Sequence, residues 1–340
     1  MKPTDFAIYL SKYFATYLPG QLGESINTVL SYRDTFALFL RYCKERENLP
    51  PEKLTLSQIN ANLIEGFLNW VEYERGCCVG TRNNRLAAIH AFYRYLQYEL
   101  PEMLLPFQEI LSIPFKKTQK KLISYLTLDG IKCLLAQPNK NTYSGLRDLC
   151  LLSLLYDTGA RVQEIVDLKM EDVRLSYPTV IRLTGKGRKT RQVPIMKNTE
   201  EILRNYLSIH DSNYMFHNNS PLFCNRTGVK LTRAGISYIL KKYTLQAKAQ
   251  NESIIPENLS PHSLRHSKAM HLLQAGVNLV YIRDLLGHAD ISTTEIYARA
   301  DESLKRKALE TAYESPIPTD NITIWQKDAA LLDWLNNLGK

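Results

Sequence analysis

One segment of this chain, from Leu146 to Tyr156, is apolar on nearly all its sides and restricts the possible folds more than any other. A helix with one polar side can lie at a protein surface, but a helix that is apolar all round must be enclosed by other elements. Gly159 follows the segment and is of a residue type that commonly ends helices. The segment therefore predicts a central helix with the other helices of its domain packed around it.

Apolar residues recur at helical spacing through the first hundred residues. The last predicted helix of this region leaves Arg82 and Arg85 available to solvent or to a bound anion, although an ordinary bundle with a solvated basic face is equally compatible with the composition. We predict a compact four-helix domain over residues 1–115, with helices from Phe6 to Leu18, Ser25 to Arg46, Ser57 to Gly76 and Thr81 to Tyr98.

Two β-prone segments, Thr179 to Leu183 and Gln192 to Ile195, flank the sequence GKGRK at 185–189. Glycines on both sides of Lys186 allow a tight turn that projects the lysine without obstruction, so we predict a β-hairpin with a basic tip. A solvated basic loop is the alternative. Together with the helices, the hairpin predicts a mainly α fold with a small antiparallel β-sheet, which is the α+β class.

Basic residues are concentrated in the middle of the chain. The protein has 43 Lys and Arg against 34 Asp and Glu, a net charge of +9, and residues 119–300 alone carry 25 against 15. This excess favours a polyanionic partner such as nucleic acid, although many proteins of similar charge bind none. The six cysteines form no C-x-x-C pair and are expected to be reduced. Asp5 and Lys12 interrupt the apolar residues of the N-terminus, and Ser153 interrupts the longest apolar stretch. We therefore predict no signal peptide and no membrane span, and expect a cytoplasmic protein.

Prolines and lysines dominate the segment from Pro101 to Leu122, which predicts an exposed linker rather than packed structure. We expect Lys116 and Lys117 to contact phosphate groups of a nucleic acid rather than only water. The predicted parts of the chain are a helical domain at 1–115, a basic linker at 116–123, a second domain at 124–313, and a proline-broken linker with a short amphipathic helix at 314–340.

A helix-start signal, Ser260-Pro261, precedes a group of basic residues near the end of the second domain. His262, Arg265 and His266 follow at spacings that place them on one helix face, close to an N-terminus whose amides attract anions. This arrangement predicts a phosphate site. We assign His266 a structural role, as a histidine that satisfies a backbone group.

Four motifs of this sequence resemble those of one enzyme family, the tyrosine recombinases, which include the phage integrases and the Xer proteins. Each motif alone is a weak signal, but all four occur in the family's order within residues 158–297. The motifs are TGARVQE at 158–164, TGKGRKTRQVPI at 184–195, HSLRH at 262–266, and LLGH at 285–288 followed nine residues later by Tyr297. The resemblance implies an N-terminal SAM-like core-binding domain that clamps DNA and a catalytic domain with the tyrosine recombinase fold.

The chemistry of these residues suits a phosphodiester, since fixed cations take the place of the clustered carboxylates that a metal-dependent nuclease needs. We therefore expect no metal and no cofactor. The roles that the resemblance also implies are phosphate binding by Arg161 and Arg265, general-base catalysis by His262, protonation of the leaving 5′ oxygen by Lys186, a hydrogen bond to phosphate from His288, nucleophilic attack by Tyr297, and orientation of Arg161 or a histidine by Glu164. The expected DNA-binding residues are Arg82, Arg85, Lys116, Lys117, Arg188 and Lys189.

The resemblance implies double-stranded DNA as the partner and a homotetramer on two synapsed sites. It predicts that strands are exchanged through a 3′-phosphotyrosyl intermediate and a Holliday junction without ATP. The predicted role is integration, excision or transposition of a mobile element, and accessory DNA-bending proteins are possible additional partners. The apolar stripe of the short C-terminal helix predicts that it docks in trans on a neighbouring subunit, with docking in cis on its own domain as the alternative. Two alternatives stand beside this prediction: a type IB topoisomerase-like enzyme that relaxes supercoils as a monomer, and a DNA-binding regulator that has lost catalysis.

Overall fold

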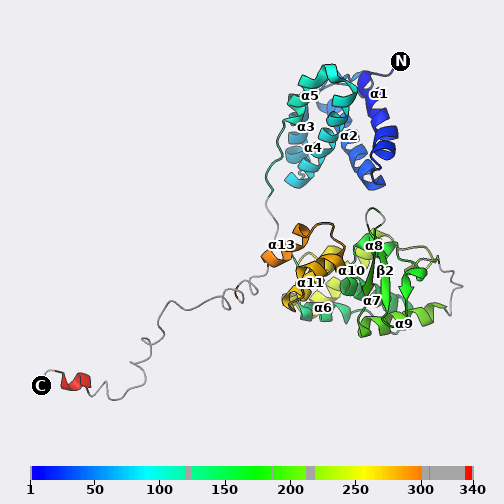
Figure 1. The fold of residues 1–340 in the computed structure, drawn as a ribbon, viewed down its shortest axis with the longest axis vertical. Helices are drawn as coiled ribbons and strands as arrows, with labels where there is room; N and C mark the ends of the chain where they lie inside the picture. The colour runs from blue at the N-terminus through cyan, green and yellow to red at the C-terminus, as the bar shows by residue number, and fades with distance from the viewer. Residues whose placement is uncertain are drawn as a thin grey trace. The chain divides into compact units, whose positions relative to one another are not determined.

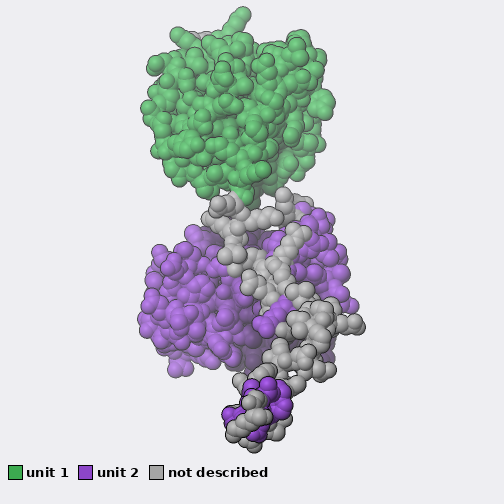
Figure 2. All heavy atoms as spheres, turned by 90° about the vertical axis from the view of Figure 1, so that its left-hand side faces the viewer, with its two compact units in different colours: residues 1–121 green, residues 122–340 purple. Residues whose placement is uncertain are grey.

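The computed structural model describes residues 2–118, 124–185, 187, 189–211, 219–300, 306 and 334–338, with the backbone alone at 210, 211, 299 and 300. The chain divides into two compact units, Met1–Lys121 and Leu122–Lys340, which are coloured green and purple in Figure 2. Each unit has its own apolar core. Among the described helices, none combines the length and the apolar character needed to cross a membrane.

The first unit consists of helices (Figure 1). Thr4, Ser25 and Asn60 cap three of them, because each side chain accepts a hydrogen bond from a backbone N–H of the first turn. The helices are α1 Asp5–Lys12 with its π-helical continuation η1 Tyr13–Gln21, α2 Ile26–Arg46, α3 Ala61–Asn69 with its continuation η4 Trp70–Glu74, α4 Val79–Glu99 and α5 Leu104–Leu111, joined by the short 3-10 turns η2 Pro51–Lys53, η3 Leu56–Gln58 and η5 Pro101–Met103.

The stretch that follows α4 is packed, so the prediction of an exposed linker from Pro101 onward is wrong for its first part. Helix α5 lies in this stretch, and its Phe107 and Ile110 are buried in the core of the first unit. Ile113, just beyond the helix, is buried there as well. Pro106 does not prevent the helix, because it occupies the first turn, where a backbone N–H has no helical partner to lose.

Helix α7, Tyr143–Thr158, forms the centre of the second unit and is buried along almost its whole length, as predicted. Gly159 ends it in a left-handed conformation, with a φ of 58°. The other elements of this unit are α6 Leu128–Leu135, α8 Val162–Val166, η6 Met170–Asp172, β1 Val173–Arg174, β2 Val180–Thr184, β3 Thr190–Pro194, α9 Lys197–Asp211, α10 Arg233–Gln250, η8 Glu252–Ile254, α11 Pro261–Gln274, α12 Leu279–Leu286 and α13 Ser292–Ala300.

The predicted hairpin is confirmed. Strands β2 and β3 pair antiparallel from Val180↔Pro194 to Thr184↔Thr190, and β1 adds to β2 to give a three-stranded antiparallel sheet. The fold class, mainly α with a small antiparallel sheet, is confirmed as well.

Helices α11, α12 and α13 enclose a second, smaller apolar cluster in this unit, which we call the satellite cluster. It is distinct from the core around α7. Its buried members are Ala269, Met270, Leu273, Ile282, Leu286 and Tyr297.

Candidate active site

Arg265 of α11 is held inside the second unit by two backbone carbonyls. Its side chain is 3% exposed, and its Nη1 and Nη2 donate to the oxygens of Gly159 at 2.7 Å and Leu286 at 2.8 Å. Burial, with a smaller contribution from Arg161, lowers the pKa of Arg265 to about 10. The guanidinium therefore remains charged at neutral pH in a fixed position.

A buried carboxylate, Glu164, joins two further arginines. Arg161, which precedes α8, donates from its backbone N–H to Oε2 at 2.8 Å and from Nη1 to Oε1 at 3.0 Å. Arg191 of β3 donates from Nη1 to Oε1 at 2.9 Å and from Nη2 to Oε2 at 2.8 Å. Burial alone would raise the pKa of Glu164, but these bonds, those from Arg191 foremost, hold it below its usual range. Glu164 is therefore ionised at neutral pH and orients both guanidinium groups.

Three consecutive carbonyl oxygens at the end of α12 each accept a hydrogen bond from a different arginine. Carbonyls at a helix C-terminus lack partners within the helix and carry partial negative charge, so they attract cations. The pairs are Arg191 Nε with Leu285 O at 2.8 Å, Arg265 Nη2 with Leu286 O at 2.8 Å, and Arg161 Nη2 with Gly287 O at 3.2 Å. We call Arg161, Arg191, Arg265 and Glu164 the arginine cluster. The end of α12 holds this cluster directly before His288.

Gly287 occupies a position that strongly favours glycine. It ends α12 with a φ of 66°, in the left-handed region. A Cβ at this position would also lie 2.9 Å from Arg191 Nη1. The glycine of the LLGH motif thus allows the arginine to approach the helix end.

His288 and His262 lie beside the arginine cluster. Nδ1 of His288 is 2.9 Å from Thr294 Oγ1. Burial first, and then the neighbouring arginines, lower the pKa of His288 to about 4. The pKa of His262, in the first turn of α11, is also lowered, by partial burial and by Arg265. Both imidazoles are therefore largely neutral at pH 7.

Tyr297 of α13 is buried in the satellite cluster, with 1% of its surface exposed. Its hydroxyl lies 2.9 Å from Nδ1 of His266, so this ring nitrogen pairs with a side chain rather than with a backbone group. The interpretation of His266 as a histidine that satisfies a backbone group is therefore wrong, because α11 and α13 bring the two side chains together. Burial raises the pKa of Tyr297, and the charges of Arg265 and Arg161 oppose this.

A cleft of about 610 Å³ opens over the arginine cluster. Arg161, Arg191 and His288 line one part of it, and Gly185 and Lys189 line another. The N–H of Gly185 donates to the oxygen of Lys189 at 2.8 Å, which closes the base of the hairpin turn. Lys186 and Arg188 lie outside the described residues. Within the described ranges, no three His, Cys, Asp or Glu side chains are grouped to hold a metal ion.

The basic residues predicted to bind DNA in the first unit form more contacts within the protein than expected. Arg82 is 5% exposed and donates to the oxygen of Pro114 at 3.2 Å, so the prediction that it faces solvent is wrong. Arg85 is half-buried and donates to Thr35 Oγ1 at 2.9 Å. Lys116 pairs with Glu72 Oε2 at 2.7 Å. Of these three lysine and arginine sites and Lys117, only Lys117 is exposed, and in the second unit Lys189 is exposed as well.

Sequence reasoning missed Arg191 and the contact of His266. One signal for Arg191 was available: in the strand sequence TRQVP, Arg191 shares a strand face with Val193, which is buried. A charged residue on the inner face of a strand requires a buried partner of opposite charge. The partner itself, Glu164, comes from another element and could not be read from spacing.

Sequence comparison relates nearly the whole chain to known proteins. The profile of the Phage integrase family matches residues 124–303, and that of the Phage integrase, N-terminal SAM-like domain matches residues 12–99. The chain is 37% identical over 337 residues to y4rC of Sinorhizobium fredii, an integrase/recombinase by name, with 99% of each chain covered. It is 33% identical over 297 residues to the tyrosine recombinase XerD of Oceanobacillus iheyensis, which covers 87% of this chain and 95% of the relative.

Solved structures share the fold. The XerH recombinase in its post-cleavage complex with difH DNA superposes with a TM-score of 0.68 at 24% identity, over 85% of this chain and 80% of XerH. The Tn1549 transposon integrase in complex with transposon right end DNA gives a TM-score of 0.70 at 15% identity, over 88% of this chain and 98% of the integrase.

Proposed function

The chain belongs to the phage integrase family, the tyrosine recombinases, whose members break and rejoin DNA, and we propose that it performs site-specific recombination through a covalent bond between Tyr297 and a DNA 3′ phosphate. The observation that carries the proposal is the convergence of the arginine cluster, His288 and the His266–Tyr297 pair within one unit. The test is incubation with DNA from the region flanking the gene. The expected product is a covalent adduct in which Tyr297 carries the DNA.

Arg161 and Arg265 provide the positive charge for the phosphate. Attack on a phosphodiester concentrates negative charge on its non-bridging oxygens, and the planar guanidinium offers parallel donors to them. Arg161 has 35% of its side chain exposed and lines the cleft, so it is accessible to DNA. Arg265 is held rigidly behind it, and donors that are already oriented need no rearrangement when the charge develops.

Tyr297 must leave its buried position before it can attack a duplex. Its raised pKa means that the phenol is protonated at neutral pH, so a base has to accept the proton. We assign this role to His262, which is exposed in the first turn of α11, while His266 holds the hydroxyl in the DNA-free protein. The two imidazole rings lie 6.4 Å apart. His266 is the alternative base, because its Nδ1 already meets the hydroxyl.

The remaining steps follow from the chemistry of the leaving group. An alkoxide leaves poorly, so the 5′ oxygen needs a proton, and we assign its transfer to Lys186 at the hairpin tip. The P–O bond to the 5′ oxygen breaks as the bond to the Tyr297 oxygen forms, which conserves the phosphodiester energy. A 5′ hydroxyl from another strand can then reverse the reaction without metal or ATP.

We further propose that two double-stranded sites are recombined in a synaptic tetramer through a Holliday junction, and that the role is integration, excision or transposition of a mobile element. The names of the relative y4rC, an integrase/recombinase, and of the Tn1549 transposon integrase favour this role. The XerD relatives and the XerH complex with difH show that the same family includes other recombinases. Recombinant products that require two sites separate this proposal from relaxation by a monomeric topoisomerase-like enzyme.

DNA affinity is expected to fall as salt rises, because each lysine bound to phosphate releases counterions. Replacing Lys117 by Ala should reduce the slope of log K against log salt by about 0.9, since that lysine is exposed. Lys116→Ala is the matched control, and its effect should be smaller because Glu72 already holds its ammonium group. Filter binding from 50 to 300 mM salt, roughly, measures both slopes. Equal effects, or a wild-type slope near zero, would contradict the expected contacts.

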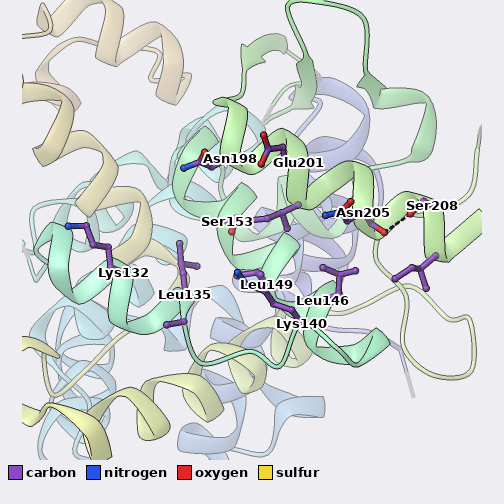
Figure 3. Close-up of a pocket in the computed structure, with 13 residues that line it drawn as sticks. Lys132, Leu135, Lys140, Leu146, Leu149, Ser153, Asn198, Glu201, Asn205 and Ser208 are labelled. Carbon is purple, nitrogen blue, oxygen red and sulfur yellow. Dashed lines mark hydrogen bonds between the residues drawn. The ribbon is translucent and has the colours of Figure 1, made fainter.

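The C-terminal helix has a candidate acceptor in the second unit, a groove between α6, α7 and α9 (Figure 3). The floor of the groove is apolar, with Leu135, Leu146 and Leu149, and polar side chains such as Lys132, Asn198 and Glu201 lie around it. Residues 334–338, the described part of the C-terminal end, form a helical turn that exposes Trp334, Leu335 and Leu338. A helix this short is not stable alone and needs an apolar surface. We propose that it docks in this groove of a neighbouring subunit.

Deletion of residues 322–340 should leave the affinity for a single DNA site nearly unchanged. It should reduce synaptic tetramers and recombination by at least about tenfold, because losing about 1.4 kcal/mol of contact free energy between subunits lowers their association constant about tenfold. Native gel electrophoresis with one-site and two-site DNA measures both. Leu135→Lys in the groove should have the same effect as the deletion. A truncated protein that cleaves faster as a monomer would instead identify the tail as an inhibitor acting in cis.

A further inference from the structure

Arg191 uses all three of its nitrogen atoms to connect separate elements of the second unit. Nη1 and Nη2 bind both oxygens of Glu164, and Nε binds the oxygen of Leu285 at the end of α12. The side chain is 14% exposed. A single residue of β3 therefore ties the hairpin to the carboxylate that orients Arg161 and to the helix end that precedes His288.

The hydrogen bonds of Glu164 show why Arg161 cannot take over the contacts that Arg191 makes. Each carboxylate oxygen accepts one bond from Arg161 and one from Arg191, so the acceptor sites are shared evenly. Arg161 is the more exposed of the two and faces the cleft. Without Arg191, a carboxylate that is 4% exposed would have only Arg161, the more exposed of the two arginines, to hold it.

We propose that Arg191 is a positioning residue for strand cleavage, which fixes Glu164 for Arg161 and fixes the end of α12 ahead of His288 without binding the DNA phosphate itself. The inference rests on the proposed recombinase function and adds a residue to it. Because bidentate geometry and the bond to Leu285 both require the planar fork, lysine should replace Arg191 only in part.

The pH dependence of cleavage reports on the ionisation of Glu164, and it would not change if Arg191 served only to stabilise the fold. Among the described residues, the charged groups around this carboxylate are Arg161 before α8, Arg191 on β3 and Arg265 on α11. Burial favours the neutral acid, and the bonds from Arg191 are the largest opposing influence. In Arg191→Met the pKa of Glu164 therefore rises, and the carboxyl orients Arg161 only at a pH high enough to ionise it.

Single-turnover formation of the covalent adduct on nicked DNA tests this directly. At pH 7, Arg191→Met should form adduct about 100-fold more slowly than wild type, the loss typical of a catalytic group displaced by about 1 Å, and Arg191→Lys should lie between them. DNA affinity should change less than about threefold, since no phosphate contact is lost. The deficit of Arg191→Met should shrink as pH rises from about 6 to 9, since Glu164 then ionises.

Controls separate this inference from the proposed function. Arg182→Met removes another sheet arginine that pairs with carboxylates, Asp172 and Glu171, and should leave the rate near that of wild type. Addition of Glu164→Gln to Arg191→Met should abolish the recovery at high pH. If wild type forms no adduct, the proposed function fails; if wild type reacts and Arg191→Met reacts equally fast, the inference fails. A slow Arg191→Met whose rate does not recover with pH, or recovers equally with Glu164→Gln, also overturns it.

Discussion

Tyr297→Phe is expected to eliminate the covalent protein–DNA adduct completely while DNA binding remains. The substitution removes one oxygen, the proposed nucleophile, from a ring that packs in the satellite cluster. Its hydrogen bond to His266 is also lost, which should lower the free energy of unfolding by only about 1 kcal/mol. The measurement is a nicked suicide substrate, on which the cut end diffuses away and the adduct accumulates for detection by denaturing electrophoresis.

The second unit contains a closely matched control. Tyr156 is half-buried, and its hydroxyl, like that of Tyr297, lies near Nδ1 of a histidine, at 3.0 Å from His271. Tyr156→Phe therefore removes the same atom and the same type of hydrogen bond, yet adduct formation should persist. An adduct in Tyr297→Phe, or its loss in Tyr156→Phe as well, would refute the assignment of the nucleophile.

Lys186→Ala is expected to slow cleavage of ordinary DNA by about 100- to 10,000-fold, the usual contribution of a general acid. The same variant should cleave DNA with sulfur at the 5′ bridging position at close to the wild-type rate, because a thiolate leaves without a proton. Lys186 itself lies outside the described residues. The described hairpin supports the assignment, since Gly185 and Lys189 at its base line the cleft with Arg161.

Lys189→Ala is the control for this experiment, because it removes a positive charge from the same turn. It should weaken DNA binding slightly and leave the two substrates equally affected. Failure of Lys186→Ala to cleave either substrate would show that the lysine does something other than protonate the leaving oxygen.

Elements with strong local signals were predicted well. Helix α7 is apolar on nearly all sides, which predicts that it is buried, and it is. Gly159 ends that helix, as its residue type suggests. The hairpin was specified by glycines between two β-prone segments. Ser260-Pro261 marked the start of α11 to within one residue.

The failures in the first unit have one origin. Prolines at 101 and 106 indicated a linker, but both stand at positions where a helix tolerates proline, so α5 was missed. The chain after α5 supplies the carbonyl of Pro114 that binds Arg82. Because the covering segment was not predicted, the burial of Arg82 could not be predicted either.

The sequence predicted the candidate site residues and the pairing of Glu164 with Arg161, but not the other pairings. His266 and Tyr297 are 31 positions apart, and Arg191 and Glu164 are 27 apart. Such pairs depend on how helices and strands pack in three dimensions, and helical or strand periodicity carries no information about them. The partners of His266 and Arg191 therefore had to come from the structure.

The satellite cluster has a consequence for how reactivity is controlled. Tyr297 is buried, but in the small group of side chains between α11, α12 and α13 rather than in the large core around α7. Proteins open locally with free energies well below that of global unfolding, in units that often match such supersecondary elements. Exposure of the tyrosine is thus a local opening equilibrium. Under the proposed mechanism, movement of α13 alone would release Tyr297, while α11 and the end of α12 keep their contacts with the arginines.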